Sequence, residues 1–209
     1  MVWTLHDLWP FCGAEHYLTN ADKDRRYAEG YTRSNRLPSS KGADLDRWIW
    51  IYKCHNWSNL PRLVIAPGQW AADKAKASKL FGGRPIRVIP NAINTRVYKT
   101  HHQAAARYAL NLRKKRALII FGAVSPTSDP RKGFDLLVDA MEHLEGSKVE
   151  IAVFGASHGP GEEVFGCPTR YLGYLHDDLT RSLVYAAADV VLVPSRIESF
   201  GLTAAEALS

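Results

Sequence analysis

The chain has 209 residues, of which 46% are hydrophobic and 23% are charged, and its formal net charge is +6. This is ordinary globular composition with enough apolar residues for a sizeable core. The basic excess is spread along the chain without a dense arm of lysine and arginine, so no nucleic acid partner is expected. No apolar run is long enough to span a bilayer, and there is no signal peptide.

The three cysteines, Cys12, Cys54 and Cys167, share no C-x-x-C spacing, which favours free thiols in a reducing compartment and a cytoplasmic location. Cys12 and Cys54 could collect a metal with His16 and His55, but their spacings match no standard zinc pattern. No other segment has the spacing of a metal-binding motif, so the sequence predicts neither a metal nor a resident cofactor.

The first ninety residues contain three short apolar segments that predict strands. These are Val2 to Leu5, Leu63 to Ala66 and Ile86 to Ile89. Helical spacing predicts helices over Asp44 to Asn56, with Trp48, Ile51 and Tyr52 on one face, and over Gln69 to Phe81. The polar stretch from about Thr19 to Gly42 is expected to be a surface loop.

The remainder alternates apolar strands with helices. Strands are expected at 117–122, 149–154, 169–172 and 190–193, and helices at 102–112, 133–144, 179–188 and from 201 onward. This alternation is typical of an α/β protein whose parallel sheets are covered on both faces. All six tryptophans lie within the first seventy residues, which supports a boundary near Asn91.

The most informative segment runs from Asp189 to Leu208. It predicts an apolar strand, a loop with Glu198, and a helix that opens at Gly201 and carries Glu206. A strand that leads into a helix N-terminus forms an anion site, because unpaired backbone N–H groups and the helix dipole point outward. A carboxylate on each side suits a ligand with phosphate in its middle and hydroxyls at both ends, such as a nucleotide sugar.

Four segments together resemble one family. Glu198 and Glu206 match the E-x7-E signature of retaining glycosyltransferases of family 4, and Arg131-Lys132-Gly133 after Phe121-Gly122 resembles its second donor motif. Val88-Ile-Pro-Asn91 resembles its interdomain segment, and Thr4-Leu-His6-Asp7 its acceptor-side strand end. In detail the chain looks most like transferases of capsule, colanic-acid or O-antigen synthesis.

The resemblance implies a GT-B fold, with two Rossmann-like domains facing across a cleft, both incomplete in a chain that looks like an internal fragment. Residues 1–91 would belong to the acceptor-side domain, 92–116 to an interdomain linker and helix, and 117–209 to the nucleotide-sugar domain. We therefore expect residues 1–209 alone to be inactive. Peripheral contact with the inner membrane face is a further expectation, and the exposed lysines of the 69–81 helix could supply it; a merely solvated helix face is favoured.

The resemblance also implies roles for individual residues. Glu206 would hold the ribose hydroxyls and Glu198 would face the donor sugar; were both helical, about 12 Å would separate them. Gly201 and Leu202 would present N–H groups to the diphosphate, and Lys132 would stabilise the departing nucleotide. The other donor-site residues expected are Gly122, Arg131 and Phe200. Ala123 stands where the family has an arginine, and Arg131 would compensate.

His6, at a strand end, would donate to a hydroxyl or the leaving phosphate, which makes His6, Lys132 and Glu198 the expected catalytic residues. The implied reaction moves a hexose from a UDP- or GDP-sugar to a saccharide or lipid-linked saccharide acceptor without a metal. Three alternatives remain: exposed charges without a role, a nucleotide-sugar epimerase of the same fold, and a non-catalytic binding module. Asp22-Lys-Asp24 and Asp44-Leu-Asp46 imitate a D-x-D metal motif but lie in polar surroundings, so we reject both.

Overall fold

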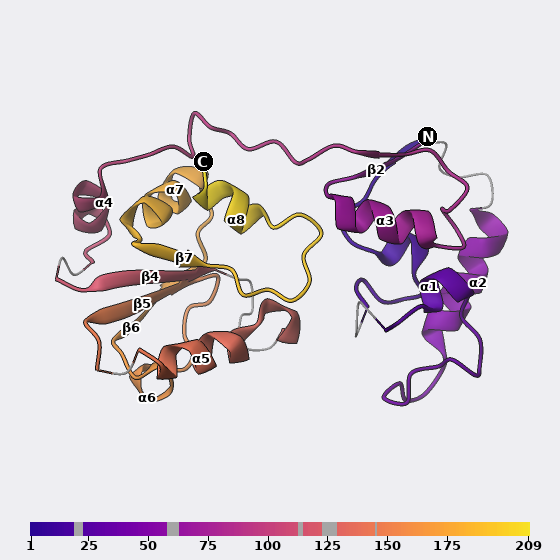
Figure 1. Cartoon of the computed structure of the whole chain (residues 1–209), viewed down its shortest axis with the longest axis horizontal. Coiled ribbons are helices and arrows are strands. Elements are labelled where there is room, and N and C mark those ends of the chain that lie inside the picture. The colour runs from indigo at the N-terminus through magenta and orange to yellow at the C-terminus, as the bar shows by residue number, and fades with distance from the viewer. Residues whose placement is uncertain (19–22, 58–62, 113–114, 123–128, 145) are drawn as a thin grey trace. The chain divides into compact units, whose positions relative to one another are not determined.

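The computed structural model describes residues 1–18, 23–57, 63–112, 115–122, 129–144 and 146–209. The chain divides into two compact units, Met1–Asn91 and Ala92–Ser209 (Figure 1). Within the described residues, no helix combines the length and the apolar character that a membrane span requires.

The N-terminal unit is built on a three-stranded parallel sheet in the order β1-β2-β3. The strands are β1 (Val2–Thr4), β2 (Leu63–Ala66) and β3 (Ile86–Val88). Its helical segments are η1 (Trp9–Phe11), α1 (Arg26–Glu29), α2 (Leu45–Asn56) and α3 (Gln69–Ala77). One apolar cluster joins sheet and helices, and its largest members include Phe11, Trp50 and Phe81. The unit therefore has its own core.

The helix predicted over Asp44 to Asn56 is present as α2, but the face with Trp48 and Tyr52 is not the buried one. Trp48 and Tyr52 are 62% and 59% exposed, and the buried residues of α2 are Trp50 and Lys53. The segment expected to be a surface loop contains α1, in which Arg26 and Tyr27 are buried. Both differences have one cause: the buried side of this unit contains charged side chains, with Arg26 paired to carboxylates and Lys53 donating to backbone carbonyls, and apolar periodicity does not detect them.

The C-terminal unit is a four-stranded parallel sheet in the order β6-β5-β4-β7. The strands are β4 (Ala117–Gly122), β5 (Val149–Phe154), β6 (Thr169–Gly173) and β7 (Val190–Leu192). Its helices are α4 (Gln103–Ala109), η2 (Pro130–Lys132), α5 (Phe134–Glu142), α6 (Glu162–Phe165), α7 (Asp178–Ala187) and α8 (Leu202–Ala207). The predicted α/β class with parallel sheets is confirmed, and β4 and β5 occupy the predicted ranges.

Both faces of this second sheet are covered, as continuous apolar strands predict. Leu118 and Ile120 of β4 pack in a cluster with α4 and α7, whereas Ile119 and Phe121 pack in another with α5 and α6. Figure 1 shows α7 and α8 on one side of the sheet and α5 and α6 on the other.

Segment 92–116, expected to be a linker and helix, contains α4. Arg107 Nε of α4 donates to the Ala187 carbonyl at 2.8 Å.

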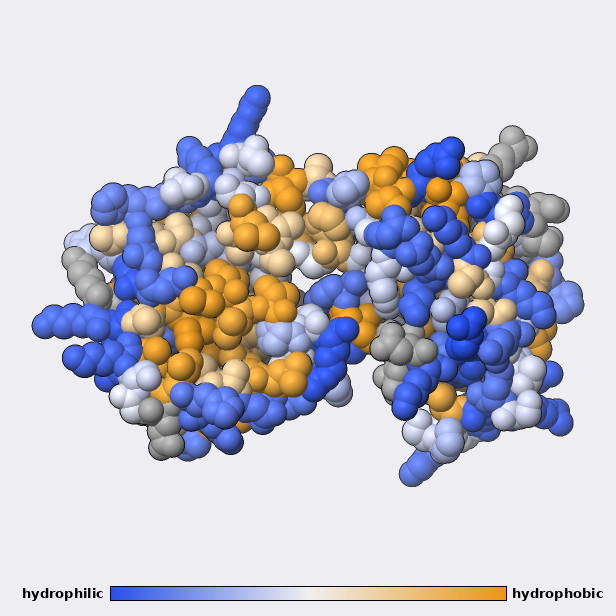
Figure 2. Space-filling model, in the orientation of Figure 1, coloured by the Kyte–Doolittle hydropathy of each residue, from blue (hydrophilic) through white to orange (hydrophobic). Residues whose placement is uncertain are grey.

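β7 is an edge strand of this sheet, and Val190 on it is 48% exposed. Apolar side chains gather over the strands of this unit (Figure 2).

The charge also differs between the units. Residues 1–91 contain 14 Lys or Arg and 8 Asp or Glu, while residues 92–209 contain 13 of each. The expected even spread is therefore wrong, because the whole excess of +6 lies in the N-terminal unit.

Candidate donor site

The carboxyl ends of the parallel strands of the C-terminal unit meet at one edge of the sheet, which is where open α/β sheets bind ligands. Gly122 ends β4, Gly155 follows β5, and Gly173 ends β6. A pocket of about 230 Å³ lies at this edge. We call it the carboxyl-edge pocket, and it is lined by Gly122, Phe154, Gly155, Tyr174, Leu175, Arg181, Tyr185, Leu202, Thr203 and Glu206.

Three residues expected in the donor site, Gly122, Leu202 and Glu206, thus line one pocket. Gly122 has a packing reason as well, because a Cβ there would lie 2.0 Å from Cζ of Phe154. Sequence reasoning missed Arg181 and Tyr185. Their i, i+4 spacing on a helix before the E-x7-E segment was the only available signal.

The Glu206 side chain is 9% exposed and has two partners from α7. The Tyr185 hydroxyl donates to Oε2 at 2.8 Å, and Arg181 Nη1 lies 3.4 Å from Oε1. Burial, and then the hydrogen bond to Glu206, raises the pKa of Tyr185. The hydroxyl therefore keeps its proton and remains a donor to Glu206.

A second feature pairs two of the expected catalytic residues. Lys132 Nζ lies 2.6 Å from Oε1 of Glu198, and their side chains are 25% and 31% exposed. Lys132 ends η2, and Glu198 lies in the loop between β7 and α8. Only Glu206 is helical, so the 12 Å spacing expected from a continuous helix does not apply to this pair of glutamates.

The two loops that carry Lys132 and Glu198 are joined by further contacts. The Arg196 amide donates to the Arg131 carbonyl at 2.8 Å, and the Arg196 guanidinium contacts both oxygens of Asp135 at 2.6 Å. Gly133 has a φ of 68°, and a Cβ there would lie 2.2 Å from the Pro194 carbonyl oxygen. The close approach of the loops therefore depends on a glycine at this position.

The remaining expected donor-site residues differ in surroundings. The Arg131 guanidinium donates to both oxygens of Asp129, at 3.0 and 2.6 Å, so a neighbouring carboxylate already engages the cation expected to compensate at Ala123. Ala123 lies outside the described residues. Gly201 has a φ of 83° before α8, and Phe200 is half-buried in the preceding loop.

His6 lies in the N-terminal unit, directly after β1 and Leu5, with an exposed side chain. The neighbouring Asp7 accepts from the Trp9 amide at 2.9 Å and contacts His16 Nδ1 at 2.6 Å. No described contact ties Asp7 to the His6 ring.

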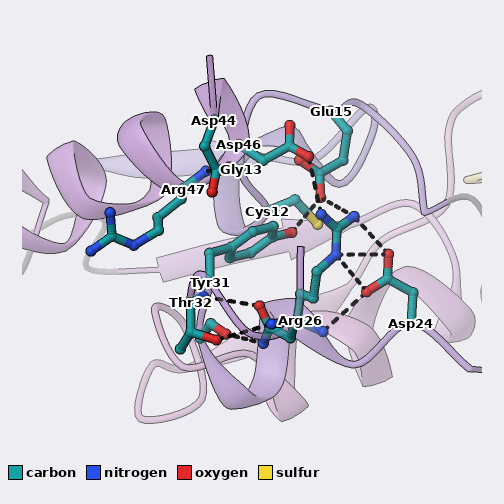
Figure 3. A network of polar contacts seen from close by, with 12 residues as sticks. Cys12, Gly13, Glu15, Asp24, Arg26, Tyr31, Thr32, Asp44, Asp46 and Arg47 are labelled. Carbon is teal, nitrogen blue, oxygen red and sulfur yellow. Dashed lines mark hydrogen bonds and ion pairs between the residues drawn. The ribbon is translucent and has the colours of Figure 1, made fainter. Parts of the chain in front are cut away.

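The N-terminal unit also contains a cluster of buried charges centred on Arg26 (Figure 3). Arg26, 5% exposed, contacts Asp24 at 2.8 Å, Asp46 at 3.0 Å and Glu15 at 3.2 Å. Tyr31 donates to Glu15. Of the two segments that imitate a D-x-D motif, the described carboxylates of Asp24, Asp44 and Asp46 thus all have structural partners. Asp44 caps α2 by accepting from the Arg47 amide at 3.2 Å, and Asp22 lies outside the described residues.

In the same unit, Lys53 is almost fully buried and donates to the carbonyls of Trp9, Cys12 and Gly13 at 2.5 to 3.1 Å. Burial lowers the pKa of Lys53 to about 8. Burial raises the pKa of the Cys12 thiol, whose side chain is fully buried. Among the described residues, no three His, Cys, Asp or Glu side chains gather in an arrangement that could hold a metal ion.

Two of the lysines in and just after α3 lie over aromatic rings. Lys74 lies over the Tyr27 and Trp70 rings at 5.6 and 5.9 Å, and Lys79, just beyond the helix, lies 5.8 Å from the Trp50 ring. Lys76 is exposed and lies 3.8 Å from Asp73.

Comparison with known proteins adds context to this geometry. Residues 115–209 match the family model described as "Glycosyl transferases group 1". A D-inositol 3-phosphate glycosyltransferase of Mycobacteroides abscessus is 33% identical over 220 residues, which cover 98% of this chain and 45% of that protein. The chain spans less than half the length of the curated relatives it matches.

Two solved structures are also similar. The sucrose-phosphate synthase of Thermosynechococcus elongatus aligns with a TM-score of 0.61 at 25% identity, over 81% of this chain and 44% of that one. HepE of Anabaena, solved in complex with UDP, aligns with a TM-score of 0.62 at 19% identity, over 99% of this chain and 50% of that one. The HepE likeness is one of fold.

Proposed function

We infer that the chain is part of a group 1 glycosyltransferase of the GT-B fold, and we propose that its C-terminal unit binds the nucleotide-sugar donor. The observation that carries the proposal is the carboxyl-edge pocket. It brings Glu206 together with Gly122 and Leu202, at the sheet edge where α/β proteins bind nucleotides.

The ribose, the diphosphate and the sugar of a nucleotide sugar each have a matching group in this unit. Glu206 has a largely buried carboxylate, which can accept hydrogen bonds from ribose hydroxyls. The Lys132 ammonium has three donors, so it can contact a diphosphate while keeping Glu198. Glu198 would then face the donor sugar, with Gly201, Leu202 and the half-buried Phe200 beside the diphosphate. Arg131 would act there only indirectly, since Asp129 holds it.

The proposed reaction is retaining and needs no metal ion. The bond between the anomeric carbon and the diphosphate oxygen breaks, and the acceptor oxygen bonds to that carbon on the same face. The acceptor's proton passes to the departing diphosphate. Lys132 stabilises the negative charge that develops on this leaving group, which is often the largest catalytic contribution. His6 would act from the acceptor side as a donor to a hydroxyl or to the phosphate.

The donor proposed is a UDP- or GDP-hexose, and the UDP complex of HepE supports the uridine form. The acceptor proposed is a saccharide or lipid-linked saccharide. The +6 charge of residues 1–91 would favour an anionic acceptor or peripheral contact with an anionic membrane surface. The three free cysteines support a reducing, cytoplasmic setting.

Thermal-shift measurements with UDP, GDP and dTDP test this proposal. A nucleotide at about 100 times its Kd should stabilise the protein by about 2.7 kcal/mol, which raises its melting temperature measurably. We expect UDP or GDP to give this shift and free uridine or guanosine to give less, because the diphosphate contacts are lost. No shift with any nucleotide would overturn the donor site, and epimerisation of a nucleotide sugar without an acceptor would overturn the transfer reaction.

A further inference from the structure

Both carboxylate oxygens of Glu206 contact side chains that project from one face of α7. Tyr185 and Arg181 are four residues apart on that helix, so their side chains project from the same face. The Tyr185 hydroxyl lies 2.8 Å from Oε2, and Arg181 Nη1 lies 3.4 Å from Oε1. Each oxygen of the carboxylate therefore has a partner from α7.

Counting acceptor positions shows what this arrangement leaves open. An ionised carboxylate has about four lone-pair sites on its two oxygens. In the described part of the chain, the Glu206 carboxylate accepts the hydrogen bonds from Tyr185 and Arg181 and no other. One site on each oxygen remains, on a side chain that lines the carboxyl-edge pocket. Two free acceptors on neighbouring oxygens match the two adjacent hydroxyls of a ribose.

Tyr185 is itself fixed in place. It is 9% exposed, and its ring packs against Phe154 at 5.8 Å and Tyr98 at 6.2 Å between centroids. Because the ring is confined by other aromatic rings, its hydroxyl reaches Oε2 of Glu206 without losing further side-chain freedom on ligand binding.

Arg181 is also restrained. Its Nη2 donates to Oδ1 of Asp178 at 3.2 Å, and the same oxygen accepts from the Tyr98 hydroxyl at 3.0 Å. Tyr98 therefore contacts both arrangements, because its ring packs against the Tyr185 ring and its hydroxyl donates to Asp178, the partner of Arg181. These contacts connect the two partners of Glu206 into one network within the C-terminal unit.

We propose that Tyr185 and Arg181 are positioning residues that hold the Glu206 carboxylate so that its two remaining acceptor sites receive the ribose hydroxyls of the donor nucleotide. This inference rests on the donor site proposed above. It adds that the preference for a ribonucleotide over a deoxyribonucleotide depends on α7, through residues that need not touch the nucleotide.

Calorimetric titration with two pairs of probes tests the proposal: UDP against 2′-deoxy-UDP, and GDP against 2′-deoxy-GDP. The measured quantity is the ratio of ribo to deoxyribo affinity, which a general loss of stability would leave unchanged. In the unaltered protein we expect a ratio of about 10 or more for the base that binds, because a hydrogen bond to a charged group is lost. Tyr185→Phe and Arg181→Gln should each lower that ratio by several-fold.

Tyr171→Phe is the matched control. Tyr171 is another partly buried tyrosine of the same unit, and its hydroxyl donates to the Pro160 carbonyl at 2.8 Å, away from Glu206. It should keep the ratio of the unaltered protein. If Tyr185→Phe does not fold, Arg181→Gln carries the test, because its side chain is 28% exposed and its loss perturbs packing less.

Glu206→Ala separates this inference from the proposed function. If it binds UDP and GDP as tightly as the unaltered protein, the donor site itself is wrong. If it binds weakly while Tyr185→Phe and Arg181→Gln keep the full ribo to deoxyribo ratio, the positioning role is wrong and the donor site stands. Weak binding by Glu206→Ala together with lowered ratios in both α7 variants supports both.

Discussion

The ammonium of Lys132 and the carboxylate of Glu198 form an ion pair at 2.6 Å, although 66 positions separate them in the chain. The pair joins the loop after β4 to the loop after β7 at the carboxyl edge of the sheet. The two side chains are 25% and 31% exposed. In the proposed donor site, this ion pair would keep a cation in place for the diphosphate.

Lys132→Ala should weaken binding of a nucleoside diphosphate by about 10- to 100-fold, because a hydrogen bond between charged groups is lost. Binding of the corresponding nucleoside, which lacks phosphate, should change little. Isothermal titration with UDP and uridine, or GDP and guanosine, measures both. Lys148→Ala, at an exposed lysine of the same unit, is the control and should bind like the unaltered protein. Equal weakening of nucleoside and nucleotide would contradict a phosphate contact.

Gly133→Ala should destabilise the C-terminal unit in two ways. A residue other than glycine at a φ of 68° costs about 1 to 2 kcal/mol, and the new Cβ would collide with the Pro194 carbonyl. Gly146→Ala is a matched control, since its φ is 77° but nothing lies within 4 Å of its added Cβ. Urea unfolding followed by far-UV circular dichroism should show a loss for Gly133→Ala that exceeds the control by about 1 to 3 kcal/mol. Equal losses would mean that the loop contact carries no energy.

The fold of the C-terminal unit was predictable from the sequence because β4 and β5 are almost entirely apolar. β5 is buried at all six positions, with Glu150 as its one charged residue, and such runs can be placed without knowledge of their partners. The N-terminal unit was predicted less well. Arg26 and Lys53 are buried there beside carboxylates and carbonyls that come from distant segments, and periodicity cannot show which charges will pair.

The site was predictable to the extent that it lies in contiguous motifs. Glu206, Gly201 and Lys132 occupy the expected strand-to-helix segments, whereas Arg181 and Tyr185 contact Glu206 only because α7 packs against α8. Arg131 lies in the expected motif too, but the motif does not reveal its partner: Asp129, two residues earlier, accepts from its guanidinium at 3.0 and 2.6 Å.

Arg26→Met should destabilise the N-terminal unit by about 3 kcal/mol or more, because it leaves three carboxylates without their buried cation. Tryptophan fluorescence during urea unfolding reports on this unit alone, since all six tryptophans lie within the first seventy residues. Arg25→Ala is the neighbouring control. Arg25 is 63% exposed and pairs with Glu29 at 3.6 Å, so its loss should cost less than about 0.5 kcal/mol. Similar costs for both variants would show that the buried cluster is not stabilising.

Asp189 predicts a dependence of stability on pH. Burial alone would raise its pKa, but hydrogen bonds from the Leu118 amide and Arg107 outweigh burial and hold the pKa below the ordinary value of 3.8. The folded state therefore favours the charged form. The resulting stabilisation is present above pH 3.8 and is lost as the pH falls through the lower folded-state pKa.

Asp189→Asn should accordingly be less stable than the unaltered protein at pH 6, and this difference should shrink as the pH is lowered below about 3.8. Urea unfolding at a series of pH values measures the difference. Asp139→Asn, at an exposed position on α5, should give a small difference at every pH. A gap between Asp189→Asn and the unaltered protein that stays constant down to pH 2 would contradict the assigned ion pair.

In the proposed function, Glu206 in the carboxyl-edge pocket binds the ribose of a nucleotide sugar. The most direct test is calorimetric titration of UDP and GDP into the unaltered protein, Glu206→Ala, and Glu142→Ala as an exposed control on α5. We predict that Glu206→Ala loses affinity by about 10-fold or more for the nucleotide that binds, while Glu142→Ala binds normally. Unchanged affinity in Glu206→Ala would contradict the donor-site assignment.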